Sequence, residues 1–204
     1  MLIQLSFRLT FLMMVSLAPI PVPTNDDWSL VKESQSIKVY KSNQDDGYKE
    51  IRIEAIFEAT IEDLVRVLND VDRYPVWVFK CREAERLGAT KSGFLRYRMI
   101  SDFPFPFKDR ELVAVSRSYI DEQGVYHSSS HAEWIDLHDT DRILVPKFDA
   151  KWTVRPWDGD KIRVEYEVST HPGGMIPAWL YNMAVDLGPF KTMEALQKQL
   201  EESI

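Results

Sequence analysis

The chain has 204 residues, of which 45% are hydrophobic and 12% aromatic, with a formal net charge of −7 at pH 7 and a pI near 5.2. This length and apolar content suffice for one domain with a sizeable core and for the wall of a cavity. Phosphate neutralisation needs clustered Lys and Arg, which the chain lacks, so we expect no nucleic-acid partner.

The N-terminal segment predicts an exported protein. Arg8 is followed by an uncharged apolar run over residues 9–20, which is too short to span a bilayer but typical of the core of a signal peptide. We therefore expect residues 1–24 to be a signal peptide, cleaved between Ala18 and Asn25, and the mature protein to be periplasmic or secreted. An uncleaved segment that anchors the chain to a membrane is the alternative.

Cysteine and histidine usage predicts neither a metal site nor a cofactor. Cys81 is the only cysteine, which excludes an intramolecular disulfide and a cysteine-based zinc site, and we expect it to be a small buried hydrophobe. His127 and His131 belong to one predicted strand, where their Cα atoms would lie about 13 Å apart. That separation is too large for a shared metal ion.

The first part of the remaining chain predicts helices around a hairpin. We expect a short helix over residues 28–33, and two paired strands over residues 36–41 and 48–59, where apolar residues alternate. Thr60 and Asp63 have the spacing of a capping box and predict a helix that extends to about residue 71.

The rest of the chain predicts antiparallel strands and then a long helix. Further strands are expected over residues 81–87, 94–100, 110–120, 125–137, 150–155 and 161–170. Trp134 and Trp152 are expected to pack in the core. A final helix is predicted from residue 177 to 201, kinked at Gly188-Pro189, with an apolar stripe formed by Leu180, Met183, Ala184, Leu187 and Phe190.

Together these elements predict an α+β fold of one domain, residues 25–204. A curved antiparallel sheet of about seven to nine strands wraps around the long C-terminal α-helix, and small helices follow the first strands.

Residues 102–107 read DFPFPF and place Phe103, Phe105 and Phe107 between prolines. Proline lacks the amide donor that a strand or helix interior needs, so this stretch is expected to be an ordered loop. It is either a lid over the protein's own core or a surface that meets an apolar partner.

Three strings in the predicted order of elements resemble the START (steroidogenic acute regulatory protein-related lipid-transfer) family of the helix-grip, or SRPBCC, superfamily. They are YPVW at 74–77, KDRELV at 108–113, and GGMIP at 173–177, the last followed by a helix with Trp179, Leu180 and Asn182. The chain resembles a bacterial member with a signal peptide.

The resemblance implies a cup that binds one lipid between the sheet and the last helix. It makes the 102–109 loop a flap at the cavity mouth, so Phe103, Phe105 and Phe107 become an apolar gate that packs on the last helix and touches a membrane. Members often carry a buried acid–base pair at places that correspond here to Tyr97 and Ser116, which are uncharged and therefore favour a weakly polar ligand head.

We expect one apolar, lipid-like ligand, bound for transfer or sensing by a monomer that has transient membrane contact and no catalytic residues. The expected ligand-binding residues are Tyr97, Met99, Ser116, Trp152, Tyr166, Val168, Leu180 and Met183. A helix-grip enzyme, of the cyclase or dehydratase kind, is the alternative in the same cavity, and an interaction domain without a pocket is the third possibility.

Two clusters could suggest catalysis but are expected to be structural. The serines at 128–130 lack the Gly-x-Ser-x-Gly turn of a nucleophile and are typical of a polar sheet face. The Asp109-Arg110-Glu111 cluster is expected to be a charged strand entry with a local ion pair.

Overall fold

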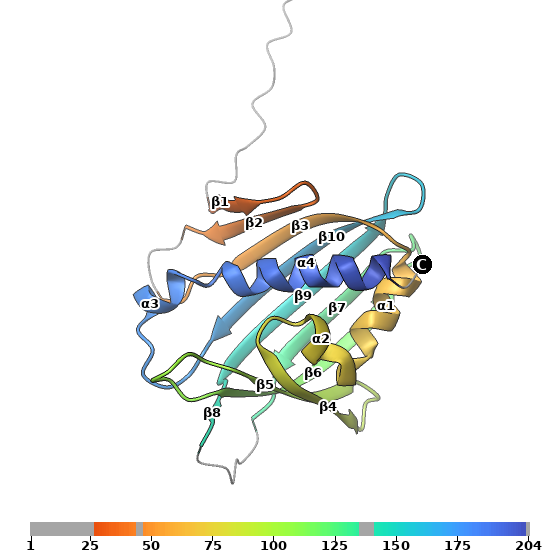
Figure 1. The fold of residues 1–204 in the computed structure, drawn as a ribbon. Helices are drawn as coiled ribbons and strands as arrows, with labels where there is room; N and C mark the ends of the chain where they lie inside the picture. The colour runs from red at the N-terminus through yellow and green to blue at the C-terminus, as the bar shows by residue number, and fades with distance from the viewer. Residues whose placement is uncertain (1–26, 44–46, 135–140, 203–204) are drawn as a thin grey trace, which may run out of the picture.

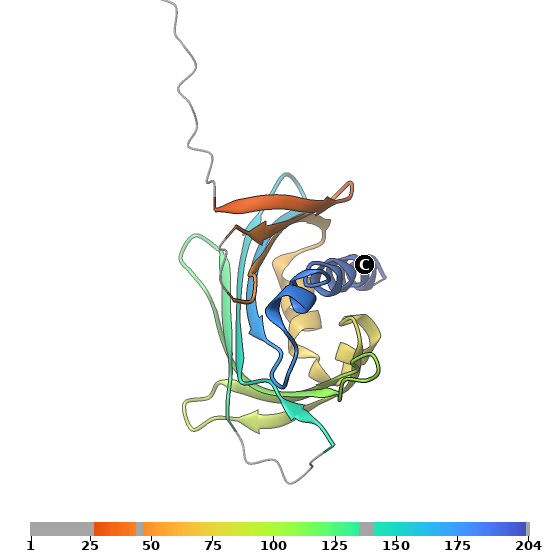
Figure 2. The same cartoon turned by 90° about the vertical axis from the view of Figure 1, so that its left-hand side faces the viewer.

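The computed structural model describes residues 27–43, 47–134 and 141–202. Their strands form one ten-stranded sheet in the order β1-β2-β3-β10-β9-β7-β6-β5-β4, with β8 paired to β6. Figure 1 shows α4 lying across this sheet, and Figure 2 shows the sheet curving around it. The predicted α+β helix-grip fold is confirmed. The predicted signal peptide lies outside the described residues.

The strands are β1 (Trp28–Glu33), β2 (Ile37–Ser42), β3 (Ile51–Glu58), β4 (Cys81–Ala89), β5 (Leu95–Ser101), β6 (Arg110–Ile120), β7 (Tyr126–Ala132), β8 (Ile143–Leu144), β9 (Lys147–Pro156) and β10 (Lys161–His171). The helices are α1 (Ile61–Asn69), the 3₁₀ turn η1 (Val71–Arg73), α2 (Tyr74–Trp77), α3 (Ala178–Asn182) and α4 (Leu187–Glu201). All strand pairs are antiparallel except the pair of β6 and β8.

The helix predicted over residues 28–33 is wrong, because this segment is the edge strand β1. It pairs with β2, with Trp28 opposite Ser42, and the Arg52 guanidinium lies 4.4 Å from the centroid of a Trp28 ring. A six-residue helix is too short to be stable by itself, whereas the free edge of β2 offers this segment a row of hydrogen-bonding partners.

The hairpin and the capping box are as predicted. β2 and β3 pair with each other, and the alternating apolar face of β3, from Ile51 to Phe57, is buried. At the start of α1 the Thr60 hydroxyl accepts a hydrogen bond from the Asp63 amide, and the Asp63 carboxylate accepts one from the Thr60 amide. These contacts orient α1 across the sheet.

The C-terminal helix is divided, not kinked at Gly188-Pro189 as predicted. The break falls at residues 183–186, and Gly188-Pro189 lie in the first turn of α4. The backbone N–H groups of a first turn have no acceptor within the helix, so Pro189, which lacks an N–H, loses no helical hydrogen bond there. The break also changes the phase of the apolar stripe. The side chains of α4 that are buried are Phe190, Met193, Leu196 and Leu200.

The predicted stripe is therefore confirmed at Phe190 and in part at Leu180, which is half-buried, and is wrong at its other three positions. Met183 is 71% exposed, and Ala184 and Leu187 are also exposed. Trp134, expected in the core, is 76% exposed where the chain leaves β7.

The main core lies between the concave face of the sheet and α1 and α4. A second cluster, built around Val71, Tyr97, Leu112 and Ala114, fills the space between η1 and strands β5 and β6. Among the described residues no helix is both long and apolar enough to cross a membrane.

Candidate functional site: a cavity between the sheet and the C-terminal helices

A cavity of about 470 Å³ lies between the concave face of the sheet and helices α2 and α4. Its volume falls in the range of small-molecule binding pockets. Six of the eight predicted ligand-binding residues line it: Tyr97, Met99, Ser116, Trp152, Tyr166 and Val168. Leu180 and Met183 are not among its lining residues, because the break before α4 changes the direction in which α3 presents its side chains.

One part of the wall is apolar and comes from β9 and β10. Trp152 and Tyr166 face each other across these strands, with ring centroids 4.4 Å apart. Val168 on β10 lies opposite Ala150 on β9, two residues further along the strands, and both side chains also line the cavity. Strand alternation places all four side chains on one face of the sheet.

Tyrosine hydroxyls are the second feature of the wall. Burial raises the pKa of Tyr97 to about 12, and burial also raises the pKa values of Tyr74 and Tyr166 above their ordinary range. These phenols are thus neutral at physiological pH. The Tyr74 hydroxyl donates to the Leu68 carbonyl at 2.7 Å, which fixes α2 against the end of α1.

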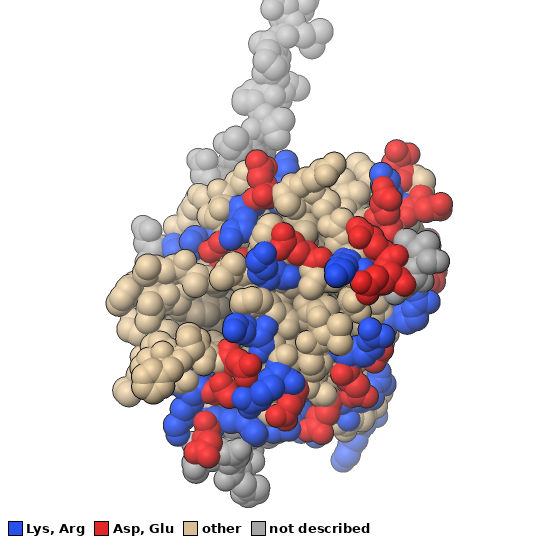
Figure 3. Space-filling view, viewed as in Figure 1, with Lys and Arg blue, Asp and Glu red and all other residues tan. Residues whose placement is uncertain are grey.

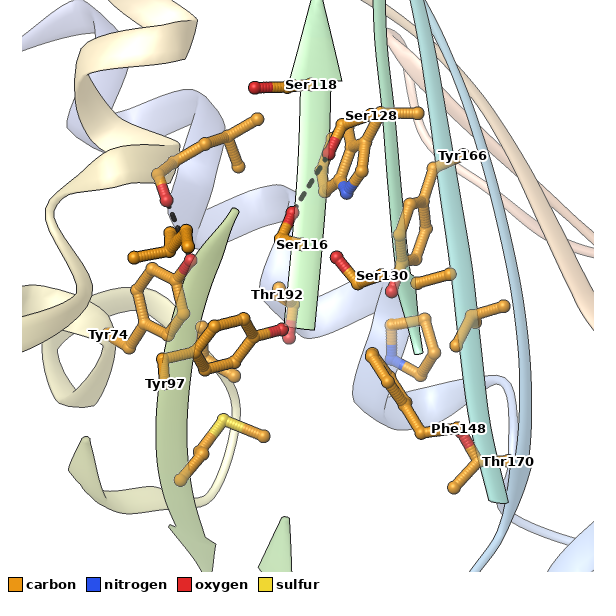
Figure 4. Close-up of a pocket in the computed structure, with 18 of the residues that line it drawn as sticks. Tyr74, Tyr97, Ser116, Ser118, Ser128, Ser130, Phe148, Tyr166, Thr170 and Thr192 are labelled. Atoms are coloured by element: carbon orange, nitrogen blue, oxygen red, sulfur yellow. Dashed lines mark hydrogen bonds between the residues drawn. The ribbon is translucent and has the colours of Figure 1, made fainter. Parts of the chain in front are cut away.

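A block of four serines on β6 and β7 forms the polar part of the wall. Ser116 pairs with Ser130 and Ser118 pairs with Ser128, so all four lie on the cavity face (Figure 4). Ser128 and Ser130 are expected from the sequence on a polar sheet face, and the structure shows that this face is part of the cavity wall. The signal was available in the alternation of the serines with Tyr126, which is buried.

Charge is almost absent from the lining. Arg117 is its one charged side chain, and no Asp, Glu, His, Lys or Cys is among the described residues that line the cavity. The guanidinium of Arg117 lies 5.6 Å from the ring centroid of Phe94.

The phenylalanine loop does not reach the cavity, since none of its three phenylalanines is among the lining residues. Phe105 is 98% exposed, and the ring of Phe103 lies 4.3 Å from the Arg110 guanidinium. Arg110 donates to the carbonyls of Pro172, at 2.7 Å, and of Lys108. The loop is thus fastened to the turn before α3 by Arg110.

Other exposed apolar side chains surround this turn. We define the apolar patch as Phe105, Met175, Trp179 and Met183, all of which are exposed. In Figure 3 the left side of the molecule, over α3 and the loop between β5 and β6, forms two lobes almost free of charged residues.

The Asp109-Arg110-Glu111 cluster opens β6 as a charged strand entry, as predicted, but the ion pairs of its acids go outside the cluster: Asp109 lies 2.6 Å from Arg82 of β4. Glu111 is buried, hydrogen-bonds to Arg98 and lies 3.6 Å from Arg142. Cys81 is buried, as expected, and burial raises the pKa of its thiol to about 11.

Residues 57–197 match the family described as polyketide cyclase / dehydrase and lipid transport. The match covers more than half of the chain. The chain belongs to this family. The match begins near the end of β3 and ends in α4, so it includes the described lining residues of the cavity except Ile51.

Individual relatives agree with the family assignment. An uncharacterized protein of Pseudomonas aeruginosa is 29% identical over 180 residues, which cover 87% of this chain and 88% of that protein. The crystal structure of a STAR-related lipid transfer protein fragment from Xanthomonas axonopodis is 30% identical, covers 86% of this chain and 99% of its own, and superposes with a TM-score of 0.78.

More distant structures share the fold. Human STARD10 is 14% identical, with a TM-score of 0.77 over 88% of this chain and 75% of its own. The Zhui aromatase/cyclase from Streptomyces is 14% identical, with a TM-score of 0.52 over 74% of this chain and 93% of its own. The family member described here therefore has the START helix-grip fold that the sequence resembles.

Proposed function

We propose that the protein binds one apolar, lipid-like ligand in this cavity and carries it for transfer or for sensing. The observation that carries the proposal is the cavity itself, about 470 Å³ between sheet and helix, with an aromatic and aliphatic wall. The printed name of the Xanthomonas relative, a lipid transfer protein, agrees with this function. Trp152, Tyr166 and Val168 would contact the apolar body of the ligand.

The composition of the lining favours binding over catalysis. A cyclase or dehydratase moves protons at its substrate, and general acid–base groups work best with pKa values near the operating pH. The titratable groups of the lining are tyrosines and Arg117, and the pKa values of Tyr74, Tyr97 and Tyr166 are raised. They are suited to donate hydrogen bonds and poorly suited to exchange protons at neutral pH.

Loading takes place at a membrane in this proposal, through the apolar patch. Each large apolar side chain that leaves water contributes about 2 kcal/mol, so two or three give reversible docking. The net charge of −7 disfavours long-range capture by anionic lipids, so the contact is local and apolar. Phe103, Phe105 and Phe107 stay a proposed membrane-contact segment outside the cavity lining, in which Phe105 is the exposed side chain and Phe103 packs against Arg110.

We also propose that residues 1–24 direct export of the protein. We further propose that the protein is a monomer. N-terminal sequencing of the protein from its native cells tests the first, and sedimentation tests the second. Neither outcome changes the proposal for the cavity.

Native mass spectrometry of the gently purified protein tests the binding proposal. We expect a mass increment of one apolar molecule per chain, which organic extraction releases and lipid analysis identifies. A protein that is folded but keeps its ligand-free mass after incubation with a membrane lipid extract contradicts the proposal. Chemical conversion of a supplied molecule would favour the enzyme alternative.

A further inference from the structure

The serine block concentrates four hydroxyl groups at one place in the cavity wall. Ser116 and Ser118 project from β6 toward the helical side of the cavity, where Tyr74 lies (Figure 4). Their neighbours across the sheet are Leu95 on β5 and, beyond β7, Trp152 on β9. The block is therefore a polar island with apolar strands on both sides.

The hydroxyls of the block are only partly committed to one another. The oxygens of Ser116 and Ser128 are 3.3 Å apart, and the Tyr97 hydroxyl hydrogen-bonds to Ser130. Two hydroxyls that share one hydrogen bond use one of their two hydrogens. Each pair thus retains a hydrogen that can be donated to a ligand oxygen.

One further donor that lacks a partner in the described ranges lies on the helical side of the cavity, in α2. Trp77 lines the cavity and is buried, and its indole N–H has no hydrogen-bond acceptor among the described residues. A buried donor without an acceptor is costly unless something satisfies it. This N–H is shielded from the cavity, so the donors available to a ligand are those of the serine block.

The block lies toward an end of the cavity that is open to water. Ser118 lines the cavity and is exposed to solvent. Three other lining residues are also exposed: Asn69 at the end of α1, Gly93 before β5, and Arg117 next to Ser118 on β6. The opposite end of the cavity holds Phe148 and Thr170 (Figure 4), and the Thr170 hydroxyl is hydrogen-bonded to Tyr181. A ligand oriented by these surroundings would place its polar end at the serines.

The same surroundings disfavour an ionised head. A carboxylate or phosphate needs charged or multiple donors to replace its hydration. Within the described part of the chain Arg117 is the one cation of the lining, and its guanidinium lies over the Phe94 ring. Neutral hydroxyls match a neutral oxygen at little desolvation cost.

We propose that the ligand is a neutral amphiphile with a hydroxyl or carbonyl oxygen at one end. That oxygen accepts a hydrogen bond from the free hydrogen of the Ser116–Ser128 pair, of the Ser130–Tyr97 pair, or of both, and the apolar body lies along Trp152 and Tyr166. This inference rests on the proposed function, because it specifies the class of ligand that the cavity binds.

Competition between three probes of equal chain length tests this ligand class. Purified protein is incubated with 1-dodecanol, dodecane and dodecanoate at pH 8, and the bound species are quantified by native mass spectrometry. We expect the alcohol to bind about tenfold more tightly than the other two, as one or two net hydrogen bonds predict. Equal binding of alcohol and alkane, or preference for the carboxylate, overturns the inference while leaving apolar binding intact.

A matched pair of variants assigns the preference to the block. The double variant Ser116→Ala, Ser130→Ala should lose the tenfold preference for the alcohol and keep its affinity for dodecane. Ser129→Ala is the control, because Ser129 is exposed on the opposite face of the same strand. An equal effect of Ser129→Ala, or no effect of the double variant, contradicts the assignment. Failure of all three probes to bind the wild type would overturn the proposed function together with this inference.

Discussion

At the scale of single residues, Thr60 and Asp63 show how a local pattern determines a local structure. Each satisfies an amide of the other at the start of α1, and the Thr60 hydroxyl also donates to the Asp63 carboxylate at 2.7 Å. Hydrogen bonds from Thr60, first that of its hydroxyl, lower the pKa of Asp63 below its ordinary value of 3.8, and Arg66 adds to the effect. All of these contacts lie within six residues of one another.

Thr60→Ala should lower the free energy of unfolding by about 1 kcal/mol at pH 7. Because the folded-state pKa of Asp63 is lowered, its contribution is present above the unfolded value and is lost as pH falls through the folded value. The difference between variant and wild type should therefore shrink between pH 5 and about pH 2. Urea unfolding across this range measures it.

Ser92→Ala, in an exposed turn, is the control for Thr60→Ala and should change stability by less than about 0.5 kcal/mol at any of these pH values. A Thr60→Ala effect that grows on acidification would contradict the capping account.

The burial of a side chain that packs against distant parts of the chain is harder to predict from sequence than the cap of a helix. Strand alternation placed Tyr166 on the apolar face, and the structure places it in the cavity wall. Ser128 and Ser130 were expected on a polar sheet face because of their residue type, and this expectation does not say whether that face is covered by helices. Trp134 was misplaced since β7 ends two residues before it.

At the scale of elements, the C-terminal helices show where periodicity fails. Residues 177–201 contain an apolar pattern compatible with one continuous helix, and local propensity does not reveal the break before α4. Residues 28–33 pose the same problem, because pairing with β2 decides their structure. Both outcomes depend on the rest of the sheet.

Substitutions of two methionines test which side chains of the C-terminal helices are buried. Met193→Ala should lower the free energy of unfolding by about 2–5 kcal/mol, because Met193 is fully buried in α4. Met183→Ala should change it by less than about 0.5 kcal/mol, because that side chain is largely exposed. Chemical denaturation compares them directly, and similar losses in the two variants would contradict the division into α3 and α4.

At the scale of the whole molecule, the order of elements and three short strings identified the fold. They could not establish the cavity, since a filled core and a lined cavity produce the same alternation of apolar residues. They also did not reveal that Arg110 fastens the phenylalanine loop to the turn before α3, a contact between residues more than 60 positions apart.

The apolar patch predicts membrane docking that single substitutions weaken. Phe105→Ser and Trp179→Ser should each reduce binding to neutral phosphatidylcholine vesicles, by up to about thirtyfold if the side chain is fully inserted. Stability should not change with Phe105→Ser, because its ring is already in water. Vesicle cosedimentation measures the binding.

Trp157→Ser is the matched control for docking. Trp157 is also exposed but lies in the turn between β9 and β10, next to Arg163. Equal losses for Trp157→Ser and Trp179→Ser would show that vesicle binding does not depend on the patch.

Photo-crosslinking with an alkyl diazirine tests most directly whether the cavity holds an apolar ligand. After illumination and peptide mapping, the account predicts about one label per chain, located on cavity residues such as Trp152, Tyr166 and Met193 and suppressed by excess unlabelled alkane. Labels confined to Phe105, Met175 and Trp179, or labels that excess alkane does not suppress, would show that apolar molecules adhere to the surface and would contradict a binding function for the cavity.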